Sequence, residues 1–444
     1  MMMSSLFCIS NLSKIMSALV MVIGIIIAKF SWNYLQGDTY KAKFYSTLLL
    51  LQALVLLLVH ADNIFLFSGL LLLSNLLLVI MLYHNTFWSA AYHSARIALQ
   101  YLVSGCLLQV IGFILLYIET GISSFSQIYT IPISYNWIVY VALGCITGSA
   151  MLQSAVMPMH RWLLNSLNAP TPVSACMHAG LINAGVLLLV RCAPLYLNNV
   201  IMLYVLFIIG VITATFGVAY KLIQPNIKRM LVCSTIAQMG FVFVQCGLGF
   251  FTAAIAHVFW HGMFKAYLFL TSPMIERQRD SNAVSLHYGS FFIGLMSGFI
   301  SAVGFSVIQG FSQVFTTTTL GLLLVVFIAG MQLALTILQS AVYDDLIIVF
   351  IASLSLGIMY GLFDMMIHYP LEGLHAMQAQ PLTTVHAIGF SLLFIPWICM
   401  LLYNHIKPKP WFKKIYAYIY VYLIRHTKAD IATTTLHRNH YRYK

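Results

Sequence analysis

Apolar stretches long enough to cross a lipid bilayer recur along almost the whole sequence. A spanning α-helix needs roughly 20 mostly apolar residues, because the hydrocarbon layer is about 30 Å thick and each helical residue adds about 1.5 Å. We place such stretches at 15–35, 43–60, 64–83, 96–118, 136–158, 173–190, 200–220, 229–248, 250–272, 288–309, 319–341, 345–367 and 383–404. They predict an all-α polytopic membrane protein of about 13 transmembrane helices, within a range of about 12 to 14.

Composition excludes a soluble globular domain. Hydrophobic residues make up 61% of the chain and charged residues only 7%, whereas soluble domains carry about 25% charged residues. We expect no cleavable signal peptide, because 1–11 has no basic n-region. The eight cysteines occur singly and form no C-x-x-C pair, so we expect neither a metal site nor an iron–sulfur cluster, and no cofactor in this chain.

Lysine and arginine gather in alternate loops and at the end of the chain. The positive-inside rule puts the basic loops in the cytoplasm and the N-terminus outside. Nine of the 22 Lys and Arg residues lie from Lys407 onward, with Asp430 as the one acid there. We therefore divide the chain into a transmembrane domain, 1–405, and a basic, aromatic cytoplasmic tail, 406–444. We expect the tail to form an amphipathic helix held by an anionic leaflet or a protein partner, and we expect no nucleic acid.

Three prolines interrupt the segment 153–191. Pro158, Pro170 and Pro172 predict breaks in the helical pattern, because proline lacks a backbone donor and clashes with the preceding turn. Irregular backbone at membrane depth is tolerated only where protein or a water-filled cavity surrounds it, so a broken helix there indicates an ion or solute path. A short surface loop between two spans is the alternative.

A stripe of ionisable residues lies in the apolar run 250–272. His257, His261 and Lys265 are spaced four residues apart, which places them on one helix face over about 12 Å. Histidine and lysine inside a span can pass protons, so the stripe is a candidate relay. The alternative is that the histidines hydrogen-bond to neighbouring helices and the lysine snorkels. The two histidines have metal-ligand spacing but no third ligand nearby, so we expect no metal.

Other polar residues lie close to the prolines. His178 is an isolated histidine early in the span that follows Pro172, and Gln153 and Asn183 are further polar candidates for the path. Arg191 lies at the end of a span, so we expect it to anchor the helix at the membrane interface and not to line the path. None of the ten acids lies in the middle of a predicted span.

These residues resemble a known superfamily. Gln153-Ser-Ala-x3-Pro, Trp162-Leu163, the APTPVSA sequence at 169–175 and His178 resemble the antiporter-like subunits of respiratory complex I and Mrp-type cation antiporters, most clearly over 136–275. The HAGLINAG sequence at 178–185 and RCAPL at 191–195 resemble the DabB type, the membrane subunit of an energy-coupled inorganic-carbon pump.

The resemblance implies two inverted helical repeats and a hydrophilic channel. It places His257, His261, Lys265 and His178 in that channel. Proton-pumping relatives carry a lysine at the position of Gln153, paired with a glutamate that aligns with Ser68. This charged pair is missing here, which puts a full pumping cycle in doubt. Passive or partner-gated proton conduction remains, and so does a non-conducting scaffold.

The expected function follows from the same resemblance. It implies a proton-conducting subunit of an inorganic-carbon uptake complex for carbon dioxide or bicarbonate, in the inner membrane of a bacterium. The expected partner is a cytoplasmic, carbonic-anhydrase-like zinc subunit of the DabA type, with zinc in that partner and none in this chain. The chain itself would be a transporter subunit and not an enzyme. The alternatives are a membrane subunit of an NADH:quinone oxidoreductase or related hydrogenase, and a Mrp-type cation/proton antiporter subunit.

Overall fold

A computed structural model describes residues 6–274, 288–310, 316–339, 346–371, 377–401 and 410–433. The boundary proposed at residue 405 lies outside these ranges, as do Glu276, Asp280, Asp344, Asp345 and Glu372. In the described part, ten crossings are long and apolar enough to span a bilayer. They are α1 (Asn11–Tyr34), α2 (Lys41–His60), α3 (Ile64–Leu82), α4 (Ser89–Thr120), the pair α8 (Thr171–Ala179) and α9 (Ala184–Arg191), α11 (Val200–Ile223), α12 (Ile227–Gly247), α14 (Tyr288–Gln309), α15 (Thr319–Gln339) and α16 (Leu346–Leu371).

Three more helices occupy the remaining predicted stretches. Two are the shorter apolar helices α6 (Trp137–Gln153) and α17 (Thr384–Leu401), and the third is α13 (Phe251–Thr271), which carries the polar stripe. The prediction of an all-α polytopic membrane protein is therefore confirmed. The short helices α5 (Phe125–Ile128), α7 (Arg161–Leu164) and α10 (Ala193–Leu197) lie in the connections between spans.

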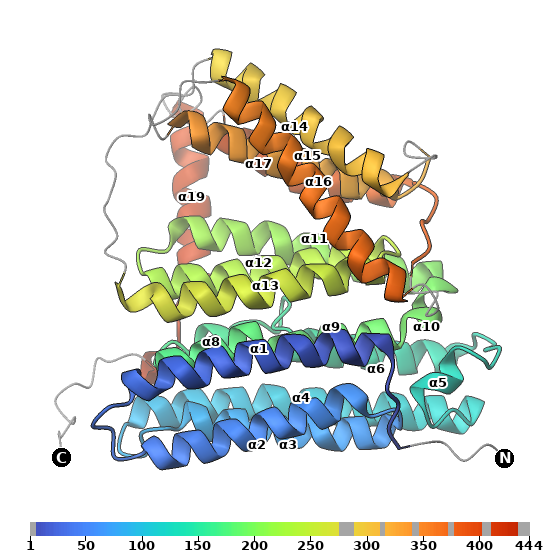
Figure 1. Ribbon diagram of the computed structural model, residues 1–444, viewed down its shortest axis with the longest axis vertical. Helices are drawn as coiled ribbons and strands as arrows, with labels where there is room; N and C mark the ends of the chain where they lie inside the picture. The colour runs from blue at the N-terminus through green and yellow to red at the C-terminus, as the bar shows by residue number, and fades with distance from the viewer. Residues whose placement is uncertain are drawn as a thin grey trace.

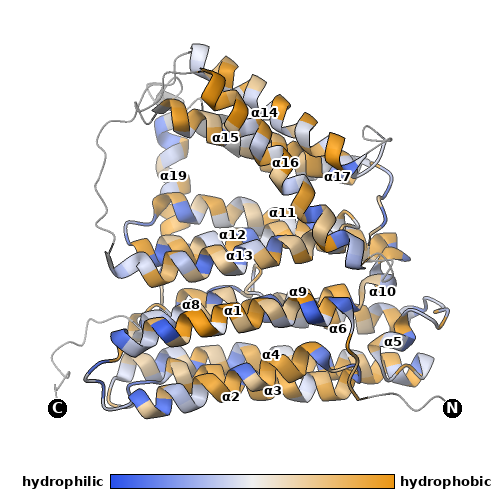
Figure 2. Ribbon diagram, viewed as in Figure 1, coloured by the Kyte–Doolittle hydropathy of each residue, from blue (hydrophilic) through white to orange (hydrophobic). Residues whose placement is uncertain are grey.

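The spans lie roughly side by side in layers (Figure 1). The first layers contain α1 to α9, the pair α11 and α12 packs above them with α13, and α14 to α17 form a tilted group at the far side. Hydrophobic residues cover most of the helix surfaces (Figure 2). Exposed aliphatic side chains such as Ile25, Leu49 and Ile118 would face lipid, as a membrane bundle requires.

Glycines hold α12 tightly against α11, and this contact positions the candidate site. A Cβ atom added to Gly240 would lie 2.4 Å from the backbone nitrogen of Ala214, and one added to Gly217 would lie 2.5 Å from that of Ala237. The absence of side chains lets the two backbones approach, as small residues do in membrane helix pairs. One face of α12 is thereby fixed toward α13.

The prolines lie between helices or at a helix start. Helix α6 ends at Gln153, Pro158 lies in the irregular segment before α7, and Pro170 and Pro172 start α8. The break inside a span falls instead at Gly180, followed by a 3-10 turn, Leu181–Asn183, before α9 begins. The helical pattern is therefore interrupted around the prolines, and the sequence did not predict the further break at Gly180.

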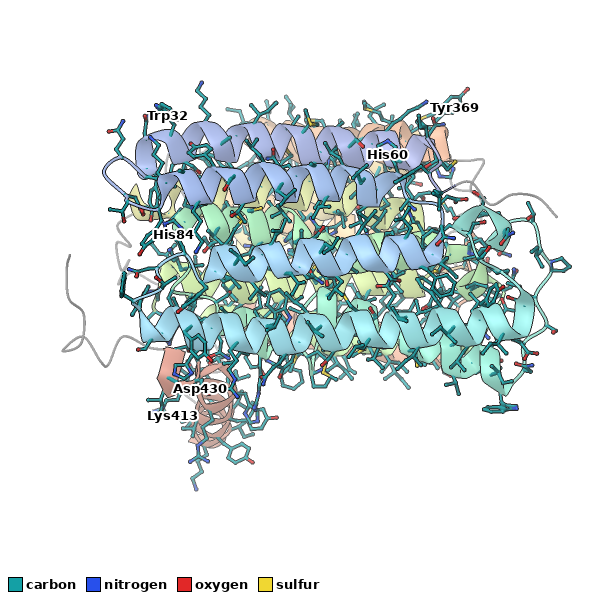
Figure 3. All side chains as sticks on the ribbon, turned by 90° about the horizontal axis from the view of Figure 1, so that it is seen from below. Trp32, His60, His84, Tyr369, Lys413 and Asp430 are labelled. Atoms are coloured by element: carbon teal, nitrogen blue, oxygen red, sulfur yellow. The ribbon has the colours of Figure 1, made fainter. Side chains whose placement is uncertain are left out.

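The tail helix α19 (Pro410–Thr427) runs across the spans (Figure 1). Beyond it, the backbone N–H of Asp430 and the hydroxyl of Thr433 donate to Oδ1 of Asn165, at 2.7 and 3.0 Å. Figure 3 shows Lys413 and Asp430 at the same end of the bundle as His84, opposite His60 and Tyr369. By the predicted topology the His84 end faces the cytoplasm, and an interfacial position of α19 stays a prediction.

Candidate functional site

The stripe on α13 lies in the interior, next to α12. Lys265 is only 1% exposed, and its Nζ donates to the carbonyl oxygen of Leu231 at 3.1 Å. His261 is buried, and neither ring nitrogen has a hydrogen-bond partner among the described residues. The His257 and His261 rings are 6.4 Å apart, centre to centre. All three side chains line one cavity of about 400 Å³, together with Ser234, Gln238 and Tyr360.

A hydrogen-bond chain connects His178 to this stripe. Leu231 O accepts from both Lys265 Nζ and Thr235 Oγ1, each at 3.1 Å. The Thr235 hydroxyl also contacts Nδ1 of His178 at 3.1 Å. Because that hydroxyl gives its one hydrogen to Leu231, we assign the hydrogen of this contact to His178 Nδ1. His178 Nε2 then carries a lone pair, has no partner among the described residues, and can accept a proton.

The His178 ring is completely buried and stacks on Phe269, with ring centres 4.3 Å apart. It lies close enough to Lys265 for the two groups to interact electrostatically. The structure thus brings His178, His261, His257 and Lys265 close together. Their role as a relay stays a prediction.

Gln153 lies apart from the stripe in a neutral amide pair. Its Oε1 accepts from Asn75 Nδ2 at 2.9 Å, and its Nε2 donates to Asn75 Oδ1 and to Leu181 O, both at 3.1 Å. The partner is therefore Asn75 and not Ser68, which instead accepts from Gln109. Asn75 lies two turns from Ser68 on α3. Two carboxamides do not ionise, so this pair can order the path but cannot carry a proton by itself.

Asn183 and Arg191 have separate roles. Asn183 Nδ2 donates to Ala179 O at 2.8 Å across the break, while its Oδ1 has no partner within the described residues. Arg191 donates to the carbonyl oxygens of Val59 and Ala61 at the end of α2, and its guanidinium lies 5.0 Å from the Phe125 ring centre. Arg191 therefore anchors span ends to one another.

One acid was missed by the sequence reasoning. Asp364 lies in the C-terminal half of α16 and is 2% exposed, so an acid away from the middle of a span is nevertheless buried inside the bundle. Its Oδ2 accepts from Gln309 Nε2 at 2.8 Å. The signal was available, because Tyr360, Asp364 and His368 recur every four residues in an apolar run.

Comparison with known proteins identifies the superfamily. Residues 60–358, more than half of the chain, match the family model described as NADH:quinone oxidoreductase/Mrp antiporter, transmembrane. The chain is 34% identical to the probable inorganic carbon transporter subunit DabB1 of Halothiobacillus neapolitanus, over 62% of this chain and 51% of that protein. It is 33% identical to the probable inorganic carbon transporter subunit DabB of Bacillus subtilis, over 59% and 52%.

Respiratory proteins are also similar. NADH-ubiquinone oxidoreductase chain 5 of Schizophyllum commune is 33% identical, over 56% of this chain and 37% of that one. The solved structure of the Mrp complex from Dietzia contains a chain of the same fold, with a TM-score of 0.59, 18% identity, and coverage of 97% of this chain and 51% of that chain. This chain therefore spans about half the length of the carbon-transporter relatives that it matches.

Proposed function

Because this chain belongs to the NADH:quinone oxidoreductase/Mrp antiporter transmembrane family, we propose that it is the proton-conducting membrane subunit of an inorganic-carbon uptake complex in a bacterial inner membrane. The observation that carries the proposal is the cavity lined by Lys265, His261 and His257. A lysine and two histidines facing one cavity inside a span form a set of groups that can each bind and release a proton.

The stripe follows α13 across part of the membrane. Lys265 lies near the cytoplasmic end, where it bonds to Leu231 one turn into α12, and His257 lies about 12 Å further along the helix axis. His178 and Thr235 lie beside Lys265 and offer a side entry through the free Nε2 lone pair. A proton would enter from the outer side at His257, move from ring to ring through water, and leave at the lysine end toward the cytoplasm, without any net covalent change in the protein.

Such a flow could drive carbon dioxide hydration by a partner. One charge crossing 100 mV releases about 2.3 kcal/mol, enough to bias a coupled hydration equilibrium roughly fifty-fold. The catalytic chemistry would reside in a cytoplasmic, carbonic-anhydrase-like zinc subunit of the DabA type. Two relatives named as inorganic carbon transporter subunits support this choice over the respiratory and exchanger alternatives. The neutral pair of Gln153 and Asn75 also favours simple conduction over a pumping cycle, which would need a charged pair.

The test is growth rescue in a bacterium that lacks carbonic anhydrase. We expect this chain and its zinc partner to restore growth in air together, and neither to do so alone. An uncoupler should abolish bicarbonate accumulation, because hydration would lose its bias. Rescue by this chain alone, or accumulation unchanged by the uncoupler, would overturn the proposal in favour of a respiratory or exchanger subunit.

A further inference from the structure

Helix α16 carries a second stripe of ionisable side chains beside the first. Tyr360, Asp364 and His368 are four residues apart, so they follow one face of α16 over about 12 Å. The helix packs against α13, where the ring of Phe363 lies 4.5 Å from that of Trp260, centre to centre. The stripe on α16 thus repeats the spacing of the stripe on α13.

Tyr360 joins the two stripes. It lines the 400 Å³ cavity that Lys265, His261 and His257 line. With His257 it also borders an adjoining cavity of about 590 Å³, whose lining includes the buried residue Gln245. Tyr360 and Asp364 are close enough to interact electrostatically. A continuous series of polar groups therefore leads from α13 to Asp364.

Asp364 has a free binding position for a proton. Gln309 Nε2 occupies its Oδ2, while Oδ1 is buried and has no partner in the described part of the chain. No cationic side chain pairs with this carboxyl among the described residues. The one ion pair in that part of the chain joins His84 to Asp38. A buried acid without a cation is costly in a membrane, and a group kept at such cost is a functional candidate.

The far end of this stripe approaches the outer surface. His368 is half-buried, the next residue, Tyr369, is 74% exposed, and the carbonyl oxygen of Pro370 accepts from Asn11 at the start of α1. Figure 3 shows Tyr369 and His60 at the end of the bundle opposite His84. The stripe on α16 therefore begins at the relay cavity and ends at the face away from the basic loops.

We propose that Tyr360, Asp364 and His368 form the outer half of the proton path, with Asp364 as its proton-binding carboxylate. A proton from the outer solution passes by way of His368 and binds Oδ1 of Asp364. It then crosses by way of the Tyr360 hydroxyl or water to an imidazole nitrogen of His257 and continues toward the cytoplasm. At the transfer from Asp364 to His257 one O–H bond breaks, one N–H bond forms, and no electrons are transferred. This inference rests on the proposed proton conduction.

The first test is voltage-driven proton flux in liposomes that contain the full chain. Asp364→Asn keeps an oxygen for Gln309 to bond but removes the proton-binding carboxylate, so flux should fall by about a hundredfold. Tyr360→Phe keeps the ring and should also reduce flux. The control is Glu119→Gln. Glu119 also lies near the outer face, but its carboxylate accepts from Asn136 and lies away from α16. Glu119→Gln should conduct like the wild type.

Labelling with dicyclohexylcarbodiimide, which reacts with carboxyl groups that can be protonated in apolar surroundings, provides a readout that does not depend on flux. Mass spectrometry of the wild type should find the label on Asp364 and not on Glu119. If Asp364→Asn conducted as well as the wild type, or if Asp364 stayed unlabelled, this inference would fail while the proposed function would stand. A wild type that conducts no protons would overturn the proposed function and, with it, the assignment of this path.

Discussion

Replacing Lys265 by methionine should stop proton conduction and leave the fold nearly unchanged. Methionine keeps the length and most of the volume of the buried stem, so no large cavity forms. The carbonyl oxygen of Leu231 loses the lysine but keeps its bond from Thr235 Oγ1, so no buried acceptor is left unpaired. A lost hydrogen bond to a charged group costs about 1.5–3 kcal/mol, and relief from burying an ammonium offsets much of this.

The expected net change in unfolding free energy is therefore within about 1 kcal/mol. Flux should fall by about a hundredfold or more, a barrier increase of about 2.7 kcal/mol, because the one lysine in the cavity is gone. The assay is dye-detected acidification of liposomes under a potassium diffusion potential, with thermal unfolding in detergent as the check on folding.

Lys228→Met is the matched control. This lysine lies one turn before Leu231 on α12 and donates to Ala169 O, outside the relay cavity. Its removal takes away the same charge from the same end of the bundle, and flux should persist. A folded Lys265→Met variant that conducts as well as Lys228→Met would refute the reasoning and leave Lys265 as a snorkelling residue.

Three further outcomes are expected. His261→Ala and His257→Ala should each weaken flux without abolishing it, since water can bridge a missing ring. If either variant were as inactive as Lys265→Met in the liposome assay, this prediction would be wrong. Gln153→Leu should cost about 1 kcal/mol of unfolding free energy, because the carboxamide of Asn75 loses its partner, while flux stays close to wild type. Burial lowers the pKa of His160 from 6.5 to about 4, so the unfolded chain binds the extra proton first as the pH falls. Stability present above pH 6.5 should therefore decline toward pH 4, and melting curves of His160→Phe should show a smaller decline than those of the wild type.

Much of the fold could be predicted from the sequence because lipid imposes simple rules. Apolar length alone located the spans, and the four-residue spacing placed His257, His261 and Lys265 on one face of α13. The two inverted repeats implied by the resemblance stay a prediction.

The errors have a common physical origin. Proline indicates where a helix cannot continue, and Pro170 and Pro172 lie at the start of α8. The break at Gly180 has no proline, so the sequence pattern does not indicate it. Long-range partners cannot be read from spacing, so the contact of Asn75 with Gln153 was not predicted. Asp364 was overlooked because the acids were judged by distance along a span and not by burial.

The most direct test of the central claim is proton flux through the purified wild-type chain in liposomes. We predict acidification that requires an imposed potential, increases with the amount of protein, and disappears in Lys265→Met while Lys228→Met retains it. Flux no greater than that of protein-free liposomes, with the chain folded and inserted, would contradict the claim that this membrane subunit conducts protons.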